Sequence, residues 1–390
     1  MRICISGAGV AGPALAHWLL YHGHQPTLVE IAPQFRRGGY IIDFWGKGYE
    51  LAERMGILPH LLERGYHVRE VRIVDEFGRK AGGFDAKRLA DALQGRFVSL
   101  PRGELASLLY DTVKDRVETL FDNSISAFAD GGDAIRAYFT HAPPREFDLV
   151  IGADGLHSNV RQLAFPQYSS PEAFLGYHVA AFETIGYRPR DELAYVSFSR
   201  PGRQIARFAM RGDRTVFMLI FASPEPIVAQ TPEAQRKVLQ TTFGGMGWES
   251  DAILAGLQRA ESFYFDRVSQ IRLPRWSTGR VALLGDAAHC PSLLAGEGCA
   301  LAIIDAYVLA GELARAGDDY AAAFLNYENR LRSFIETKQR AAKRFAGQFA
   351  PRTAIGVLVR NWATKAMNLP GIADLFLGRA LRDKLDLPDY

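Results

Sequence analysis

The sequence predicts an α/β fold in three parts: a discontinuous α/β domain, a mainly antiparallel β domain inserted into it, and a C-terminal helix. Three observations lead to this expectation. An apolar strand at residues 2–6 runs through glycines into an apolar helix, which is typical of a βαβ unit with parallel strands. Strand-like alternation replaces helical periodicity between about residues 170 and 225. An apolar strand at 280–284 then leads back into helices that continue to about residue 347.

The first βαβ unit occupies residues 1–30. RICIS forms its first strand, PALAHWLLYH forms a helix that ends at Gly23, and PTLVE forms the second strand. A further helix, GKGYELAERM, is expected over residues 46–55 and ends at Gly56. The stretch RGELASLLYDTV, residues 102–113, also has helical periodicity, and the apolar run DLVIG follows near residue 150.

The inserted β domain is indicated by two stretches of alternating apolar and polar residues. Residues 68–84 alternate around DEFG, which predicts a hairpin with its turn at Glu76 to Gly78. The strands YHVAAFETIG, LAYVSFSR, RQIARFAM and TVFMLIF are separated by turn sequences such as RPG and RGD. We therefore assign residues 1–67, 96–165 and 270–345 to the α/β domain, residues 68–95 and 166–269 to the inserted domain, and residues 346–390 to the C-terminal helical segment.

Length and composition limit the possible classes of function. A chain of 390 residues suits two domains that share an interface. A net charge of +3 is too small to indicate a nucleic-acid partner, and no stretch approaches the roughly 18 uncharged apolar residues that predict membrane insertion. The three cysteines lack the spacing of metal ligands or of a disulfide framework, so we expect no metal and a cytoplasmic protein. No secretion signal is visible at the N-terminus.

Basic residues outnumber acidic ones from Arg340 onward. Two interpretations stay open for this segment: a solvated helix face, or contact with a membrane surface or a partner. We expect the protein to be a monomer or a weak dimer.

A dinucleotide-binding turn is the strongest local signal. The pattern G-A-G-V-A-G lies between the first strand and the first helix, and Glu30 ends the second strand. Gly7 allows the tight turn, Gly9 lets a pyrophosphate approach the backbone, and Gly12 lets helix and strand pack closely. The N–H groups at the start of the helix face the phosphate, and the acid accepts hydrogen bonds from a ribose. The expected contacts are Gly7, Gly9, Val10, Ala11, Gly12 and Glu30.

Two further segments identify the family that the chain resembles. Residues 148–161, DLVIGADGLHSNVR, and residues 276–289, WSTGRVALLGDAAH, resemble two signatures of the FAD-dependent aromatic hydroxylases of the p-hydroxybenzoate hydroxylase type. The stretches RRGGYIIDFWGKG, PRGEL and DAYVLAGEL are most similar to the branch of tetracycline-inactivating monooxygenases. The resemblance covers essentially the whole chain. It implies a Rossmann-type FAD-binding domain.

The resemblance also implies roles for individual residues. Glu30 would bind the adenosine ribose, Arg102 the FAD linker, and Asp286 the ribityl or pyrophosphate region, while Asp154 would lie where flavin and nicotinamide binding are coupled. A carboxylate beside a diphosphate would repel it. Asp286 would therefore accept hydrogen bonds from ribityl hydroxyls or cap the helix whose N–H groups face the phosphate.

The chain departs from the family pattern after GDAAH. Leu293 stands at the position of a proline and Ala300 at that of an asparagine, whereas Gly296 and Gly298 are retained. These glycines let backbone N–H groups approach the flavin edge that carries negative charge on reduction. We expect the departures to retune the binding site, with loss of oxygen chemistry as the alternative.

Other candidates have two possible roles each. Asp43 either contacts cofactor or substrate or caps a turn, and Arg36 is either a cofactor contact or a solvated charge. Arg207 is either a pocket cation for an acidic substrate or a solvent-facing residue, and His289 is expected to be packed in a loop. No catalytic side chain emerges. Aromatic residues of the inserted sheet face either the core or a substrate pocket, namely Phe182, Phe198, Phe208 and Phe217.

The resulting hypothesis is a monooxygenase that binds FAD and takes electrons from NADPH or NADH. It would hydroxylate a small aromatic or polyketide-like substrate through a flavin C4a-hydroperoxide, with the cofactor carrying the chemistry. One alternative is a flavin reductase or oxidase without oxygen insertion, and another is a non-catalytic flavin- or substrate-binding protein. The WxWxIP stretch of flavin halogenases is absent from the sequence.

Overall fold

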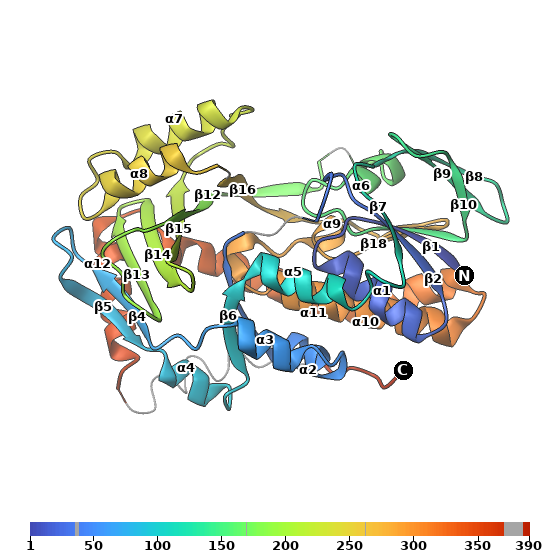
Figure 1. Cartoon of the computed structure of the whole chain (residues 1–390), viewed down its shortest axis with the longest axis horizontal. Coiled ribbons are helices and arrows are strands. Elements are labelled where there is room, and N and C mark those ends of the chain that lie inside the picture. Colours follow the sequence, from blue (N-terminus) through green and yellow to red (C-terminus); the bar gives the residue numbers. More distant parts are fainter. Residues whose placement is uncertain (36–38, 169, 262, 370–384) are drawn as a thin grey trace.

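The computed structural model describes residues 1–35, 39–168, 170–261, 263–369 and 385–390. Two large sheets, one mainly parallel and one mainly antiparallel, lie at opposite ends of the molecule, with helices between and around them (Figure 1). Every helix in the described part of the chain is too short or too polar to cross a membrane.

The first sheet has six strands and carries the N-terminus. Its order is β17-β18-β11-β1-β2-β7, and all neighbouring strands run parallel except β17 and β18. Cys4 in the central strand pairs with Val150 on one side and Thr27 on the other, so strands far apart in sequence meet here. Both faces are covered, which explains the continuous apolar runs. The strands are β1 (Arg2–Ser6), β2 (Gln25–Val29), β7 (Glu118–Leu120), β11 (Leu149–Gly152), β17 (Ser277–Thr278) and β18 (Val281–Leu283).

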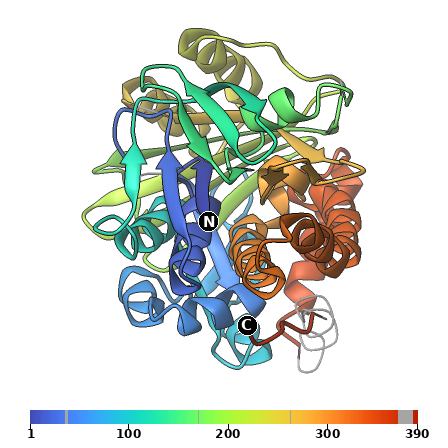
Figure 2. The ribbon, with the colours of Figure 1, turned by 90° about the vertical axis from the view of Figure 1, so that its right-hand side faces the viewer.

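Helices pack beside this sheet and around one another. The first helix is apolar around most of its circumference and packs against α10, which is itself buried over most of its length. Figure 2 shows the orange and red helices α10 and α11 beside the blue N-terminal strands. The helices are α1 (Ala11–Tyr21), α2 (Gly46–Arg54), α3 (Leu58–Arg64), α5 (Arg102–Asp111), α6 (Asn159–Ala164), α9 (Asp286–His289), the 3₁₀ turn η1 (Leu293–Ala295), α10 (Gly298–Ala316) and α11 (Tyr320–Phe349).

The second sheet has seven strands in the order β16-β12-β15-β14-β13-β4-β5, and only β13 and β4 pair in parallel. One of its faces packs under two helices in an apolar cluster that includes Phe182 and Phe217. The other face turns toward the first sheet and carries Val179 and Ile220. The elements are β4 (Glu70–Val74), β5 (Lys80–Asp85), β12 (Glu172–Ile185), β13 (Ala194–Arg200), β14 (Arg203–Met210), β15 (Arg214–Ala222), β16 (Phe263–Ile271), α7 (Pro232–Phe243) and α8 (Ser250–Arg259).

Smaller elements complete the fold around the two sheets. A two-stranded ribbon of β3 (Ile41–Trp45) and β6 (Phe97–Pro101) lies between them, and β8 (Ile125–Asp130), β9 (Ile135–Phe139) and β10 (Arg145–Phe147) form a three-stranded sheet. Helix α4 (Lys87–Ala92) follows β5 in the chain. Helix α12 (Ala354–Ala366) packs against β5.

The predicted fold class is confirmed: a discontinuous Rossmann-type α/β part, an inserted mainly antiparallel sheet and C-terminal helices. The hairpin expected around DEFG is formed by β4 and β5, and the helix expected over 102–113 begins at Arg102 and ends at Asp111. The domain boundaries stay a prediction.

Candidate functional site

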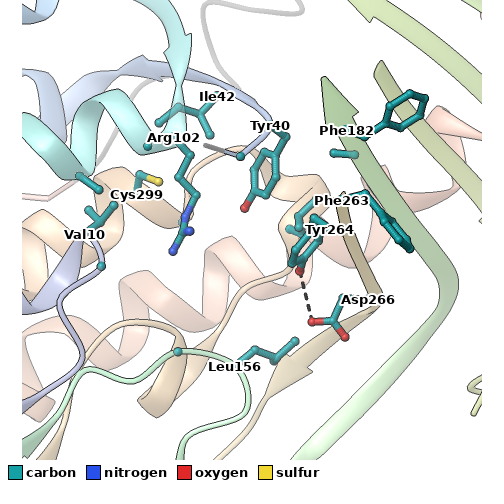
Figure 3. Close-up of a pocket in the computed structure, with 18 of the residues that line it drawn as sticks. Val10, Tyr40, Ile42, Arg102, Leu156, Phe182, Phe263, Tyr264, Asp266 and Cys299 are labelled. Carbon is teal, nitrogen blue, oxygen red and sulfur yellow. Dashed lines mark hydrogen bonds between the residues drawn. The ribbon is translucent and has the colours of Figure 1, made fainter. Parts of the chain in front are cut away.

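A cavity of about 1430 Å³ lies between the two sheets. The glycine turn after β1 lines one end of it, and β12, β16 and α8 line the other. Figure 3 shows Val10, Arg102 and Cys299 on the side of the first sheet, with Tyr264 and Asp266 facing them from the second. The cavity therefore joins the two parts of the chain in one site.

The glycine turn has the geometry that its sequence predicts. Gly7 has φ +106°, and a Cβ there would lie 2.5 Å from the carbonyl oxygen of Ala153. A Cβ on Gly12 would lie 1.9 Å from the carbonyl oxygen of Gly7. The helix can therefore pack this close to the strand only when position 12 is glycine. A Cβ on Gly9 would meet nothing nearer than Arg102 Nη2 at 3.7 Å. The backbone at Gly9 is therefore open toward the cavity, as a bound phosphate requires.

Glu30 is held rigidly at the edge of this turn. Its carboxylate accepts hydrogen bonds from the backbone N–H of Ala8 at 2.8 Å and from that of Ala32 at 2.9 Å. The side chain lines the cavity, so its remaining acceptor capacity is available to a hydroxyl group of a ligand.

Arg102 and Asp286 line the cavity between the two glycine segments. Arg102 begins α5, and Tyr40 and Cys299 lie near its guanidinium (Figure 3). Burial raises the pKa of the Cys299 thiol to about 11, and the nearby Arg102 opposes this shift. Asp286 lies in the first turn of α9 and makes no capping hydrogen bond, because the N-cap residue is Gly285. Asp286 lines the cavity, and its contact with ribityl hydroxyls stays a prediction.

The segment after GDAAH keeps its glycine geometry. Gly296 adopts φ +71° after η1, and both Gly296 and Gly298 line the cavity together with Leu293. Ala300 instead faces α2, where a Cβ added to Gly48 would lie 2.6 Å from the Ala300 Cβ. A side chain larger than alanine at position 300 would push α2 away. The departure at this position is thus matched by close packing between α2 and α10.

Asp154 borders the cavity, but much of its hydrogen-bonding capacity is used locally. It accepts hydrogen bonds from the Ser158 hydroxyl and, at 3.0 Å, from the backbone N–H of Val160. Burial raises the pKa of this carboxyl group, and the two hydrogen bonds oppose the shift. Asp154 therefore fixes the loop that follows β11.

A chain of three hydrogen-bonded polar side chains links the two sheets, and no sequence motif predicts it. The Tyr264 hydroxyl donates to Asp266 Oδ2 at 3.2 Å (Figure 3), and His157 Nε2 lies 2.9 Å from the same oxygen. Burial raises the pKa of Tyr264 well above its ordinary value, whereas the hydrogen bond to Asp266 raises the pKa of the half-exposed His157. The chain runs from the cavity to the molecular surface.

Further polar residues around the cavity were also missed. Glu183 and Arg214 line the cavity and form an ion pair at 3.3 Å, and Tyr40 stands opposite Tyr264 with ring centroids 5.8 Å apart. Strand alternation could have suggested the face of Glu183. Alternation carries no information on which strands line the cavity.

Four predicted site residues do not line the large cavity, and one of them is Gly12, which instead packs against the Gly7 carbonyl group. Arg207 is neither a pocket cation nor a solvent-facing residue, because its buried guanidinium lies 2.8 Å from both Asp191 and Glu249. Phe208 packs against Tyr66 and Tyr195 in an apolar cluster. These two side chains are therefore structural in the sheet.

Asp43 also lies outside the cavity. It accepts hydrogen bonds from Ser99 at 2.5 Å and from Tyr195 at 3.1 Å, which ties β3 to β6 and β13. Burial raises the pKa of its carboxyl group. Asp43 contacts neither wall of the large cavity.

The remaining predictions fall into three groups. Phe182 borders the cavity, but its ring stacks on Phe217 at 5.0 Å on the side of α8. Phe198 and Phe217 belong to the same apolar cluster, and His289 is buried beside Trp276 with ring centroids 4.3 Å apart. Arg36 lies outside the described residues.

The residues present fit an FAD molecule. A Cβ would fill the cradle at Gly7 and Gly12, the backbone is open at Gly9, and an acid stands at the end of β2. The basic Arg102 and the second glycine segment continue this wall toward the second sheet. The acid suits the ribose of a flavin adenine dinucleotide, the first glycine segment suits its diphosphate, and the second glycine segment suits its ring.

Comparisons with known proteins agree with this geometry. The model of the FAD binding domain family matches residues 1–338. A flavin-dependent monooxygenase from an unknown prokaryotic organism is 33% identical over 348 residues, which cover 87% of each chain. An uncharacterized protein, Rv1260 of Mycobacterium tuberculosis, is 39% identical over 339 residues, covering 86% of this chain and 91% of that one.

A solved structure extends the likeness to the whole chain. The tetracycline destructase Tet(51) superposes with a TM-score of 0.85 at 28% identity, covering 100% of this chain and 99% of that one. The chain thus combines the dinucleotide cradle, the inserted sheet and the shared cavity with sequence similarity to a known family. The chain belongs to the FAD binding domain family and is an FAD-dependent monooxygenase of the aromatic hydroxylase type.

Proposed function

We propose that this monooxygenase uses NADPH or NADH as its reductant and inserts one oxygen atom from O₂ into a small aromatic or polyketide-like molecule. The observation that carries this proposal is one continuous cavity of about 1430 Å³, which is lined by the glycine turn at one end and by β12 and β16 at the other. One continuous space holds cofactor and substrate against each other. The bound flavin supplies the redox and oxygen chemistry.

The cofactor half of the cavity is assigned to its lining residues. Glycine backbone and the start of α1 face the diphosphate, Glu30 accepts from the ribose, and Arg102 with Asp286 stands beside the linker and ribityl chain. Gly296 and Gly298 present backbone at the ring. The full proposed set is Gly7, Gly9, Val10, Ala11, Glu30, Arg102, Asp154, Asp286, Gly296 and Gly298.

The substrate half combines an apolar wall with a few polar groups. Ala181, Phe263 and Leu293 line it together with the Tyr264 hydroxyl and the Glu183–Arg214 pair. An apolar wall excludes water from the reacting atoms, and a small number of polar groups orient the ligand. An aromatic or polyketide-like molecule with peripheral hydroxyl groups suits this combination.

The test is a screen of aromatic and polyketide compounds with the flavin-loaded protein. We expect NADPH or NADH to bleach the flavin absorbance under nitrogen, and a true substrate to stimulate reductant consumption in air. Mass spectrometry of the product should show a gain of one oxygen atom. Stoichiometric hydrogen peroxide with every compound that stimulates turnover would instead indicate an oxidase.

A further inference from the structure

Helix α12 exposes a stripe of large apolar side chains. Ile355 is 74% exposed, Leu358 60%, Val359 61% and Trp362 75%. Their spacing of three, four and seven residues places them on one face of the helix. A contiguous apolar surface of this kind on a described helix calls for an occupant.

The opposite face of α12 is polar and bonded to the second sheet. The Thr364 hydroxyl accepts from the backbone N–H of Gly83 at 3.1 Å, and Arg360 Nη1 donates to Ser199 at 3.0 Å. A helix that packs on a protein core normally turns its apolar face inward. In α12 the polar face is inward and the apolar face is outward.

This orientation is fixed. Asn368, just beyond the helix, accepts from the backbone N–H of Asp85 and donates to the carbonyl of Gly83, each at 3.0 Å. A Cβ on Gly82 would lie 3.1 Å from the Asn361 carbonyl oxygen, so helix and strand are already in close contact. Because α12 is held to β5 (Figure 1) at several points, it cannot roll to bury its stripe.

The segment of the sequence that contains the stripe carries charge of one sign. Residues 340–369 contain six basic and no acidic residues. Lys343, Arg344 and Lys365 are exposed. Apolar and aromatic side chains on one helix face, accompanied by lysine and arginine, are the pattern of helices that lie in the head-group region of a membrane.

A second copy of the chain suits the same stripe less well. Two α12 helices facing each other would bring the basic residues of both copies together. Four side chains also provide far less than the roughly 800 Å² per partner of a stable protein interface. An anionic surface is complementary to the charge, and it accommodates a narrow stripe.

We propose that α12 docks on an anionic lipid bilayer, lying in the plane of the interface. The stripe of Ile355, Leu358, Val359 and Trp362 enters the head-group region, and the nearby lysines and arginines contact anionic head groups. The helix has 13 residues, which at about 1.5 Å per residue is too short to span the hydrocarbon core. This docking is independent of the reaction proposed above.

The experiment is co-sedimentation of the full-length, flavin-loaded protein with phosphatidylcholine vesicles and with mixed phosphatidylcholine–phosphatidylglycerol vesicles. We expect about tenfold more protein on the mixed vesicles, with binding that falls as salt is raised. The triple variant Leu358→Gln, Val359→Gln, Trp362→Gln should remain in solution. Its flavin absorbance should equal that of the wild type, which shows that the fold is retained.

A matched control carries Phe77→Gln and Val228→Gln, which replace apolar side chains outside α12 that are 73% and 84% exposed. This control should bind the mixed vesicles as the wild type does. Wild-type protein that stays in solution with both vesicle types overturns the proposal. So does a dimer, seen by light scattering, that the triple variant converts to a monomer, because the occupant is then a second copy.

Discussion

The two walls of the central cavity are built in different ways. The proposed cofactor wall is made largely of backbone from two short segments, Gly7 to Ala11 and the loop with Gly296 and Gly298. The substrate wall is made of side chains from strands and a helix spread over β12, β16 and α8. A backbone wall depends on where glycine is required, whereas a side-chain wall depends on which face of each strand points inward. The first can be recognised in a sequence far more directly than the second.

Strand β12 shows the difference within a single element. Glu183 lines the cavity, while the ring of the adjacent Phe182 packs under α8. Alternation along a strand defines two faces but does not say which of them meets the cofactor. The predictions that follow test whether the two walls respond to substitution as differently as they are built.

The largest effect is expected from Gly12→Val. Its Cβ would lie 1.9 Å from the Gly7 carbonyl oxygen, so α1 must move away from β1. We expect loss of flavin binding together with a destabilisation above about 4 kcal/mol, measured by the flavin-to-protein absorbance ratio and by urea unfolding. Gly9→Ala is the control, since its Cβ has 3.7 Å to the nearest atom. It should weaken FAD binding with the apoprotein equally stable, and wild-type behaviour of Gly12→Val would contradict the backbone account.

A stability effect without an effect on the site is expected from Arg207→Met. The substitution leaves the carboxylates of Asp191 and Glu249 without the buried cation between them. We expect a loss of about 3–5 kcal/mol in the free energy of unfolding, with KM unchanged. Arg214→Met at the cavity should raise KM and change the free energy of unfolding little. Its partly exposed ion pair with Glu183 contributes at most about 1 kcal/mol. A raised KM for Arg207→Met would contradict this prediction and indicate that Arg207 contacts the substrate.

Acid should weaken the second sheet through His178. Burial lowers the pKa of this imidazole to about 4, and its Nε2 accepts from the backbone N–H of Ile227 at 3.0 Å. In the unfolded chain the His178 imidazole takes up a proton near pH 6.5, whereas in the folded chain it stays neutral down to about pH 4. The free energy of unfolding therefore falls as the pH drops from about 6.5 toward 4. We expect His178→Gln to flatten this fall in urea titrations between pH 7 and pH 5. Parallel curves for wild type and variant would contradict the assignment.

The smallest effect is expected at the junction of the two walls, in the bond between His157 and Asp266. The hydrogen bond to Asp266 raises the pKa of His157 above its unfolded value. Its stabilising contribution is therefore complete below about pH 6.5 and is lost as the pH rises through the raised folded value. The thermal midpoints of wild type and His157→Gln should differ more at pH 6 than at pH 8. A difference independent of pH would show that the contact is not ionic.

Predictions from sequence succeeded where local chemistry decides the structure. The glycine turn, the hairpin around DEFG and the helix starting at Arg102 depend on neighbouring residues and were placed correctly. They failed for Asp43 and Arg207, because the partners of these residues come from distant strands. The chain of Tyr264, Asp266 and His157 joins residues more than 100 positions apart, so no spacing could reveal it.

The sequence by itself determined the α/β class, the dinucleotide cradle and the family resemblance, because each rests on glycine, turn and strand patterns within short segments. Only the tertiary structure decided which face of the inserted sheet lines the cavity, which charges neutralise one another inside it, and which side of α12 is turned outward. These outcomes depend on contacts between segments far apart in the chain. Their energies arise from burial and pairing, which a linear pattern does not contain.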